Sequence, residues 1–513
     1  MIPTLKSCER AMRLKRLVPL VVLGATLAGC ADLNVTDPNR QTTGTFWQNQ
    51  NDALAGMNAT YNALQYIGSY GRWMAFAMDG RSDIALSNSP WTDLANFNKF
   101  SLVSYDLPFN YDIWHDHYVT IFRANQVIDH VPQISNMDAT VRARVVGEAK
   151  FVRALMYSNL VNLYGSVPMP LTSLDPASTT KMPMSTSAQL WAQIEKDLTE
   201  ARAVLPATYP PSDVGRATQG SADALLGKVE LQQRKWTEAS AALTNVINGN
   251  HYSLVPMSQW KDLFTPVGNN GPEAVFEVQM STYNPDNGEV GLNIGKFCGP
   301  PQGLGPGGPG FGDCQPTQWL LSQYTDTTAG GAVDPRRDLT IFHRNSSIQN
   351  VFGTPFAVRY SDRINDIFWK KWTMSDYRNF QDFDEPINYK VIRYADVLLM
   401  AAEARNELND QAGARTYLNM VRARAGVTPV AAGLSQAAMR DAILHERVVE
   451  LALEQSRWLD LKRQNLISTP AALAVIKLHD PEFNFFTIGK SELLPIPQTE
   501  INTNPNARQN PNW

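Results

Sequence analysis

The sequence predicts a mainly α-helical protein whose helices pack in pairs and are joined by long irregular loops. Two observations carry this prediction. Apolar residues recur at steps of three and four over long stretches, which is the spacing of one face of a helix. Small and larger apolar residues also recur at identical offsets in two separate stretches, as expected for repeated helix pairs. A chain of 513 residues is long enough to bury a large core between such helices.

The first thirty residues resemble the signal peptide of a bacterial lipoprotein. Five basic side chains precede an apolar run over residues 17–27, which is too short to span a bilayer because a span takes about 20 apolar residues. The tetrapeptide Leu27-Ala28-Gly29-Cys30 follows at the place of a lipobox. We therefore expect residues 1–29 to be removed and Cys30 to carry the acyl chains that attach the protein to a membrane.

The remaining chain, residues 30–513, is mildly acidic. It carries 40 basic and 48 acidic side chains, which is a formal net charge of −8. Nucleic acids bind to basic surfaces, so this excess of carboxylates argues against a nucleic acid as partner.

Helical periodicity is clearest between Val141 and Leu163, where seven apolar side chains form one stripe and the helix is expected to end before Gly165. The stretch around Ala395–Ala402 repeats this spacing. Further helices are expected at residues 50–67, 112–131, 187–204, 222–233 and 436–454. Short strands are expected at residues 274–279 and 367–372.

Two stretches share one spacing of small and apolar residues. Offsets of 12, 4 and 3 residues separate Gly227, Ala239, Leu243 and Val246, and likewise Ala402, Ala414, Leu418 and Val421. These are the positions at which the two helices of a tetratricopeptide-like pair approach closely. The spacing therefore predicts an α-solenoid-like scaffold of such pairs.

Three stretches between the helices are longer than ordinary connections and are rich in Gly, Pro, Asn, Asp and aromatic residues: 68–110, 250–315 and 325–390. Long loops on a rigid scaffold commonly carry the binding residues. The second contains Cys298 and Cys314, the two cysteines left once Cys8 is removed and Cys30 is acylated. In an oxidising compartment we predict a disulfide between them, which stabilises the intervening Gly- and Pro-rich loop by about 3 kcal/mol in the chain-entropy model.

Several segments, taken in order, carry a family resemblance. They read "LNVTDPN", "WHDHYVTIFRANQVIDHVP", "GEAKFVRALMYSNLVNLYGSVPM", "SADALLGKVELQQRKWTEASAALTNVINGNHYSL", "VIRYADVLLMAAEARNELN", "HERVVELALEQSRWLDLKR" and "LLPIPQTEINTNPNARQNPNW". With these segments the chain resembles the SusD/RagB-type outer-membrane lipoproteins of the Bacteroidetes from Cys30 to Trp513. The resemblance implies one SusD-like domain over residues 30–513, with four tetratricopeptide-like helix pairs.

The resemblance also implies a function. Such a protein is the surface-exposed lid of a SusC-like TonB-dependent transporter, and it captures a nutrient, usually an oligosaccharide, without an enzymatic step or a cofactor. Acylated Cys30 would hold the lid on the outer membrane, facing the exterior, at a high effective concentration over its transporter. Two alternatives stay open: a RagB-like lid that captures peptides, and a structural lipoprotein whose helix pairs hold protein partners.

Capture of a sugar requires flat aromatic faces and planar polar groups. Trp73 and Trp91 flank a polar loop, and Trp372 and Tyr377 alternate with charged residues in "WKKWTMSDYRNF". The candidate ligand contacts are Tyr70, Trp73, Asp83, Asn88, Trp91, Trp372 and Tyr377. The tryptophans within predicted helices are expected in the core instead, namely Trp47, Trp114, Trp191, Trp236 and Trp458.

Motifs for catalysis or metal binding are incomplete. His445-Glu446 begins like a zinc-protease helix, but Val449 stands where the second histidine would be. The acidic segment "QDFDEP" is interpreted as a solvated turn, with calcium binding by Asp382, Asp384 and Glu385 as the alternative. Glu454 with Arg457, and Arg457 with Asp460, are expected to pair on the surface of a helix. We expect no catalytic residues and no metal site.

Overall fold

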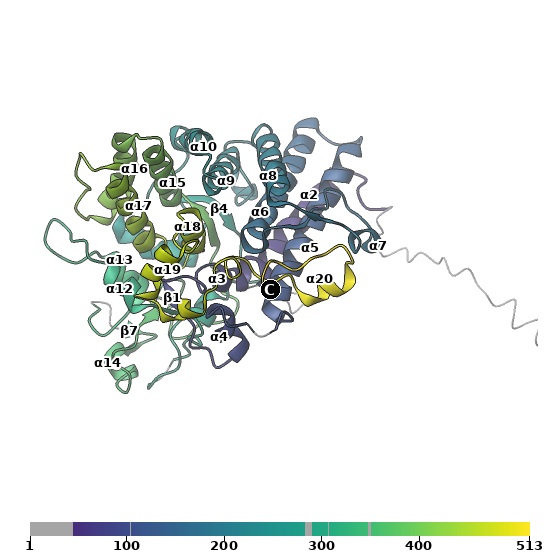
Figure 1. The fold of residues 1–513 in the computed structure, drawn as a ribbon. Coiled ribbons are helices and arrows are strands. Elements are labelled where there is room, and N and C mark those ends of the chain that lie inside the picture. Colours follow the sequence, from purple (N-terminus) through teal and green to yellow (C-terminus); the bar gives the residue numbers. More distant parts are fainter. Residues whose placement is uncertain (1–44, 103, 283–289, 306, 347–349) are drawn as a thin grey trace, which may run out of the picture. The chain divides into compact units, whose positions relative to one another are not determined.

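Helices make up 52% of the structure and strands 7%, which confirms the mainly α fold class. The structure is a computed structural model that describes residues 45–102, 104–282, 290–305, 307–346 and 350–513 (Figure 1). Cys30 and the predicted signal peptide lie outside these residues. Residues 49–513 form one compact unit, to which the description below refers. Across the described residues, every helix is too short or too polar to cross a membrane.

The long helices pack against one another in the order in which they follow along the chain. Each contacts the next, and the row is α5 (Pro108–His130), α6 (Ala139–Tyr164), α8 (Ser187–Arg202), α9 (Gln219–Gln232), α10 (Trp236–Asn248), α15 (Tyr394–Glu407) and α16 (Gln411–Ala425). Helix α2 (Gln50–Asn62) packs on α5 and α6, and α17 (Gln436–Glu450) packs on α15 and α16. Figure 1 shows α16, α15, α10, α9, α8 and α6 side by side along the upper edge of the unit.

Local signals place the helix ends. Helix α6 begins where the side chain of Asp138 accepts a hydrogen bond of 2.9 Å from the Val141 backbone N–H. It ends at Gly165, whose φ of +73° suits glycine, as the sequence predicts. Helix α8 begins with a capping box between Thr186 and Gln189.

The two helix pairs predicted from spacing are formed. A Cβ atom on Gly227 of α9 would stand 2.6 Å from Cγ of Leu243 on α10, so only a glycine permits this approach of the two helices. Ala402 of α15 and Ala414 of α16 are likewise fully buried where these helices pack. A complete solenoid of four tetratricopeptide-like pairs stays a prediction.

Two predicted helices end earlier than expected. The first stops at Asn62, and a 3-10 turn (η1, Ala63–Gln65) and a π-turn (η2, Ile67–Gly71) follow it. The other stops at Glu450, because Leu453 and Gln455 adopt positive φ angles of 59° and 60°, and a separate helix α18 (Arg457–Arg463) begins after them. Arg457 is buried and pairs with Asp83, so the predicted pairs of Arg457 on a helix surface are wrong.

The three long loops fold into short elements that gather on one side of the helix row (Figure 1). They include α3 (Trp73–Met78), β1 (Ala85–Leu86), α4 (Thr92–Asn98), η5 (Met257–Phe264), α11 (Ile294–Cys298), β5 (Gln315–Pro316), α13 (Arg336–Thr340) and α14 (Phe356–Arg359), and the short helix α12 (Gln318–Gln323) lies between the second and third loops. Both predicted strands exist: β4 (Ala274–Val278) pairs antiparallel with β10 (Tyr389–Arg393), and β9 (Phe368–Trp369) pairs with β6 (Ile341–Phe342). The remaining strands are β2 (Val167–Pro168) with β3 (Met184–Ser185), and β7 (Asn350–Val351) with β8 (Thr354–Pro355).

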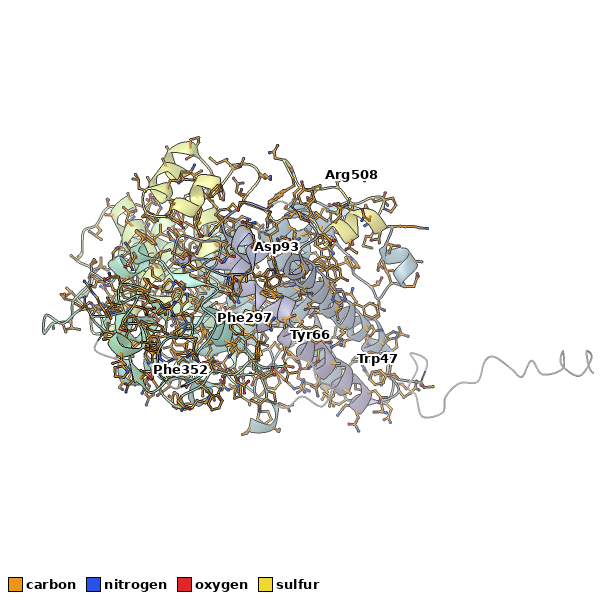
Figure 2. The ribbon with its side chains drawn as sticks, turned by 90° about the horizontal axis from the view of Figure 1, so that it is seen from below. Trp47, Tyr66, Asp93, Phe297, Phe352 and Arg508 are labelled. Carbon is orange, nitrogen blue, oxygen red and sulfur yellow. The ribbon has the colours of Figure 1, made fainter. Side chains whose placement is uncertain are left out.

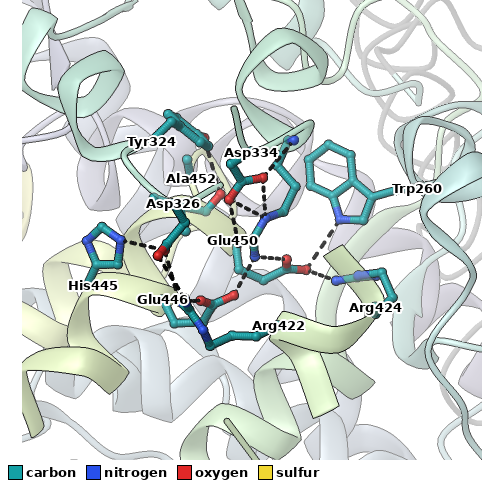
Figure 3. A network of polar contacts seen from close by, with 12 residues as sticks. Trp260, Tyr324, Asp326, Asp334, Arg422, Arg424, His445, Glu446, Glu450 and Ala452 are labelled. Carbon is teal, nitrogen blue, oxygen red and sulfur yellow. Dashed lines mark hydrogen bonds and ion pairs between the residues drawn. The ribbon is translucent and has the colours of Figure 1, made fainter. Parts of the chain in front are cut away.

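A buried network of ion pairs fastens the third loop to the helices (Figure 3). Arg336, which is fully buried, donates hydrogen bonds to Asp334 at 2.7 Å, to Glu446 at 2.5 Å and to Glu450 at 2.8 Å. Burial alone would raise the pKa of Glu450, but the charges of Arg424, Arg393 and Arg336 outweigh it and hold this pKa well below the usual range. The loop is thereby joined to α16, α17 and β10.

Tryptophans in helices are buried to different degrees. Trp114 and Trp458 lie in the core, as expected. Trp191 and Trp236, at the helices α8 and α10, are only half-buried, and so is Trp47, which precedes the compact unit. Helical position alone therefore did not determine their exposure.

Candidate functional site

The structure brings Trp73 and Trp91 together, although only Trp91 reaches the surface. Their ring centroids are 6.0 Å apart with the rings nearly perpendicular. Trp73 is buried, and its indole N–H donates a 3.0 Å hydrogen bond to Asp112 at the start of α5. Trp91 stands directly before α4 and keeps 40% of its area exposed. Trp73 therefore supports the tryptophan that can meet a ligand.

Two further exposed aromatic rings adjoin this pair. Phe311 and Phe383 are 45% and 40% exposed, and their centroids are 5.8 Å apart. Both pack on buried Phe297, at 5.4 and 6.1 Å, and Phe297 in turn packs on Trp73 at 5.7 Å. We call the exposed rings Trp91, Phe311 and Phe383 the aromatic surface. Figure 2 views the unit from below Figure 1, the side on which α4 lies, with Phe297 and Asp93 labelled.

Cationic side chains lie against the same rings. The Lys296 ammonium is 5.0 Å from the Phe311 centroid and 5.4 Å from the Phe383 centroid, and it donates a 3.1 Å hydrogen bond to the Gln381 carbonyl. The Arg72 guanidinium lies 4.0 Å from the Phe297 centroid. Such cation–π contacts contribute about 0.5–2 kcal/mol each, so they help to fix the rings that they cover.

The turn that carries Phe383 is stabilised by Asp384 and Glu385, two of the acidic residues considered as calcium ligands in the sequence analysis. Asp384 accepts hydrogen bonds from the backbone N–H groups of Val290 at 3.0 Å and Gly291 at 2.9 Å. Glu385 is buried and accepts hydrogen bonds from Arg378 and from the Asp382 backbone. The expected solvated acidic turn is thus wrong for Glu385. Among the described residues no group of three or more His, Cys, Asp or Glu side chains is placed to hold a metal ion.

Polar side chains adjoin Trp91 in the sequence. Asn88 is exposed, and its amide donates a 3.0 Å hydrogen bond to the side-chain oxygen of Gln315 on β5, which pairs with β1. This bond holds a planar amide three residues before Trp91. Asn88 therefore remains a candidate contact for the hydroxyl groups of a ligand.

A buried ion pair positions the segment between Trp73 and Trp91. Asp83 accepts two hydrogen bonds of 2.7 Å from the Arg457 guanidinium, and His479 lies 3.2 Å from it. Burial alone would raise the pKa of Asp83, but Arg457 outweighs this effect and lowers the pKa to about 2. The backbone N–H of Gln455 also donates a 2.6 Å hydrogen bond to Asp79. The segment is therefore anchored on the turn between α17 and α18.

Four predicted ligand contacts do not fit the structure because they are buried: Trp73, described above, and Tyr70, Asp83 and Trp372. Tyr70 and Trp372 are buried, and each stacks on the ring of Tyr389 at a centroid distance of 5.4 Å. The Trp372 indole N–H donates a 2.8 Å hydrogen bond to the Leu453 carbonyl. The Asp83 carboxylate forms an ion pair with Arg457. Side chains that are buried and paired in this way stabilise the fold and do not reach a ligand on the surface.

Tyr377 is exposed, but its hydroxyl is hydrogen-bonded to a residue outside the aromatic surface. Its hydroxyl donates a 2.6 Å hydrogen bond to the Asp262 carboxylate in η5, so its ring lies against η5. A role in ligand binding stays a prediction for this residue.

Cys298 and Cys314 are free thiols in the structure, so the predicted disulfide is not formed in it. Both are buried, and their side chains are in hydrogen-bond contact with each other. Burial, and then the neighbouring thiol, raises the pKa of Cys298 well above its usual range. The two cysteines thus meet as predicted, while the bond itself requires an oxidant and stays a prediction.

Two of the three rings of the aromatic surface, Phe311 and Phe383, were not predicted from the sequence. Phe311 lies in the Gly- and Pro-rich stretch considered only for its cysteines, and Phe383 lies in "QDFDEP", considered only for its carboxylates. The available signal was a single aromatic residue within an otherwise polar or glycine-rich turn, since such a residue has few neighbours to bury it.

Comparisons with known proteins agree with this architecture. The family model described as "SusD family" matches residues 272–513, and the model described as "Starch-binding associating with outer membrane" matches residues 35–231. SusD-like protein P25 of Formosa agariphila is 26% identical to this chain, over 96% of the chain and 98% of the relative.

Solved structures share the fold. A SusD superfamily protein from Bacteroides vulgatus superposes with a TM-score of 0.81 at 23% identity, covering 91% of this chain and 100% of that one. A structure described as a laminarin binding SusD-like protein has a TM-score of 0.71 at 29% identity, with coverage of 91% and 100%. These matches confirm the resemblance predicted from the sequence segments, and the chain belongs to the SusD-like proteins.

Proposed function

We propose that this protein binds an oligosaccharide on the aromatic surface and does not catalyse a reaction on it. The observation that carries the proposal is the exposure of three aromatic rings, Trp91, Phe311 and Phe383, over a buried layer of further rings. Contiguous exposed apolar patches mark binding sites on soluble proteins. Ring faces pack against the C–H groups of a sugar, and neighbouring amides such as Asn88 can bond its hydroxyl groups.

The family supports a proposal for the cellular role. We propose that the protein is anchored to the outer membrane through acylated Cys30, faces the exterior, and acts as the lid of a SusC-like TonB-dependent transporter. The family model that describes association with the outer membrane supports the location. A relative whose structure is described as laminarin binding makes laminarin the first ligand to test.

Affinity electrophoresis in gels that contain laminarin tests the proposal on the soluble chain from residue 31, which includes the whole compact unit. The parent should be retarded, and Trp91→Ala should lose most of this retardation. Phe122→Ala is the matched control, because Phe122 is an equally exposed ring on α5, outside the aromatic surface, and should leave migration unchanged.

Prolonged incubation with the same glucan tests the absence of chemistry. The chain lengths of the oligosaccharides should stay constant. Shortened products would overturn the non-enzymatic proposal, and retardation that survives Trp91→Ala would overturn the location of the site. Retention on a peptide column rather than in the glucan gel would favour a peptide-capturing lid.

A further inference from the structure

A second concave region lies between the end of α2, the turn η4 (Pro211–Asp213) with the residues after it, and β4. It consists of two adjoining cavities of about 340 and 200 Å³. Residues 214–216 and Glu277 line both cavities, so we call the two together the 214 cleft. Ligand pockets have volumes of about 300–1,000 Å³, and the larger cavity alone reaches this range.

Six of the thirteen residues that line the larger cavity carry neutral polar side chains. Its amide-bearing lining residues are Asn58, Asn62, Gln65 and Gln279, and Tyr61 and Ser212 add hydroxyl groups. The amides form a connected edge: the Asn62 side chain donates a 2.7 Å hydrogen bond to the Gln65 side-chain oxygen, and Gln65 donates one of 2.7 Å to the Gln279 carbonyl. An edge of oriented amides suits the paired hydroxyl groups of a sugar.

The charged groups of the 214 cleft are neutralised by the protein itself. Arg216 donates hydrogen bonds of 2.9 Å to both Glu148 and Asp213. Glu277 lies 2.8 Å from the Lys390 ammonium. Because each charge already has an opposite partner within the protein, the cleft offers a charged ligand little advantage over a neutral one.

The smaller cavity is also lined by neutral polar residues, and two of them carry aromatic rings. Tyr209 and Tyr252 line it, together with Thr218 and Asn270. The Tyr252 hydroxyl is 2.9 Å from the Thr218 hydroxyl, which fixes the tyrosine ring at the wall. This cavity therefore adds ring faces to the amide edge of the larger one.

The backbone between the two cavities is held in one place. Gly215 has a φ of +95°, and a Cβ atom there would stand 2.6 Å from Cδ of Gln279, so the segment lies directly against that side chain. Val214 is 53% exposed at the tip of the segment. The partition between the cavities is thus a defined part of the fold, which favours a preformed site.

We propose that the 214 cleft is a second binding site, and that it takes a neutral polyhydroxylated ligand such as a short oligosaccharide. Hydrogen bonds from the amide edge would orient the ligand, with Tyr209 and Tyr252 as the apolar walls. The proposal is independent of the aromatic surface, because none of the residues that form the aromatic surface lines either cavity.

Hydrogen exchange followed by mass spectrometry tests this on the soluble chain from residue 31. Laminarihexaose and maltohexaose serve as neutral probes, and hexagalacturonate serves as the charged one. A neutral probe at millimolar concentration should slow exchange at least twofold in peptides that cover residues 207–218 and 274–280. Peptides over residues 88–98 and 380–385 report on the aromatic surface in the same experiment.

The outcomes separate the two proposals. Protection at the cleft peptides alone supports this inference and overturns the aromatic surface, while protection at the aromatic surface alone does the reverse. Absence of protection at both sites with both neutral probes overturns both proposals. Stronger protection of the cleft by hexagalacturonate than by either neutral probe overturns the assigned ligand class.

Two variants locate the effect within the cleft. Ser212 is exposed and lines the larger cavity, so Ser212→Trp should fill that cavity and abolish the protection of the cleft peptides. Thr199→Trp, on the exposed face of α8, is the matched control and should retain the protection. Asn62→Ala removes one member of the amide edge without adding bulk, and should weaken probe binding at least threefold. Unchanged protection in both cleft variants would overturn the assignment.

Discussion

The Arg457 guanidinium donates two hydrogen bonds of 2.7 Å to the carboxylate of Asp83, which lies 374 residues earlier in the sequence. The pair is buried and joins the segment that leads to Trp91 to the first turn of α18. The location of the aromatic surface thus depends on a contact between two residues that are far apart in the sequence.

Removal of one charge from this pair should destabilise the protein strongly. Asp83→Asn leaves the Arg457 guanidinium buried without its counter-charge, which costs about 3–5 kcal/mol of unfolding free energy. Because the pKa of Asp83 is lowered to about 2, the parent has this stability above the ordinary pKa of an aspartate and loses it as the pH falls toward 2. Urea denaturation at pH 7 and pH 3 measures both effects. Asp441→Asn, at an exposed carboxylate of α17, should change little.

The two neighbouring tryptophans should respond in opposite ways to truncation. Trp91→Ala should weaken the binding of a captured oligosaccharide at least tenfold, about 1.4 kcal/mol, and leave the melting temperature nearly unchanged. Trp73→Ala should lower the unfolding free energy by about 3–5 kcal/mol, because it empties a buried site. Calorimetric titration and thermal unfolding of both variants provide the comparison. A large fall in the melting temperature of Trp91→Ala would contradict its assignment as a ligand contact.

Oxidation should join Cys298 to Cys314. The side chains already meet, so bond formation requires little movement, and closure of the loop should stabilise the protein by about 3 kcal/mol. Mass spectrometry of a non-reduced digest should detect the linked peptides, and a reductant should lower the melting temperature. Two free thiols in protein isolated from an oxidising compartment would refute the prediction.

Glu482 should make stability depend on pH in the neutral range. Burial, and then the charge of Asp480, raises its pKa to about 8, above the 4.5 of a free glutamate. The folded protein therefore holds this proton more tightly, and the contribution of Glu482 to stability falls as the pH rises from 4.5 through 8. Glu482→Gln should be more stable than the parent at pH 8 and nearly equal to it at pH 4.5. Thermal unfolding across this range measures the difference, and parallel curves for parent and variant would argue against it.

Cys30→Ala tests the membrane anchor. Without the thiol, the acyl chains have no attachment point, so the variant should leave the membrane fraction or accumulate as an uncut precursor. Fractionation in high salt, followed by the intact mass, distinguishes these results. A variant that stays with the outer membrane at its mature mass would exclude Cys30 as the anchor.

Local signals made the helices predictable. The stripe from Val141 to Leu163, the cap at Asp138 and the stop at Gly165 are all properties of neighbouring residues, and α6 has the expected course. The spacing around Gly227 likewise reported on a contact with the very next helix, α10.

Exposure in the loops could not be predicted in the same way. Trp91 and Trp372 both lie among polar residues, yet Trp372 is buried because Tyr389 of β10 and the Leu453 carbonyl cover it. Charged residues such as Arg336 and Glu450 look like surface residues in a sequence, but each is buried because its partners come from other elements. Contacts of this kind are set by the tertiary fold, so neither hydrophobic spacing nor composition reveals them.

The separation between exposed rings and the buried layer beneath them has an evolutionary consequence. Trp91, Phe311 and Phe383 are each 40–45% exposed. They pack on Trp73 and Phe297, which are buried, and the Asp83–Arg457 pair anchors the segment before Trp91. Substitutions at the outer rings should therefore cost little folding stability, whereas substitutions in the buried layer should cost more. In the proposed function, a relative with this fold would take up a different nutrient through substitutions at the three outer rings, with the buried layer beneath them kept.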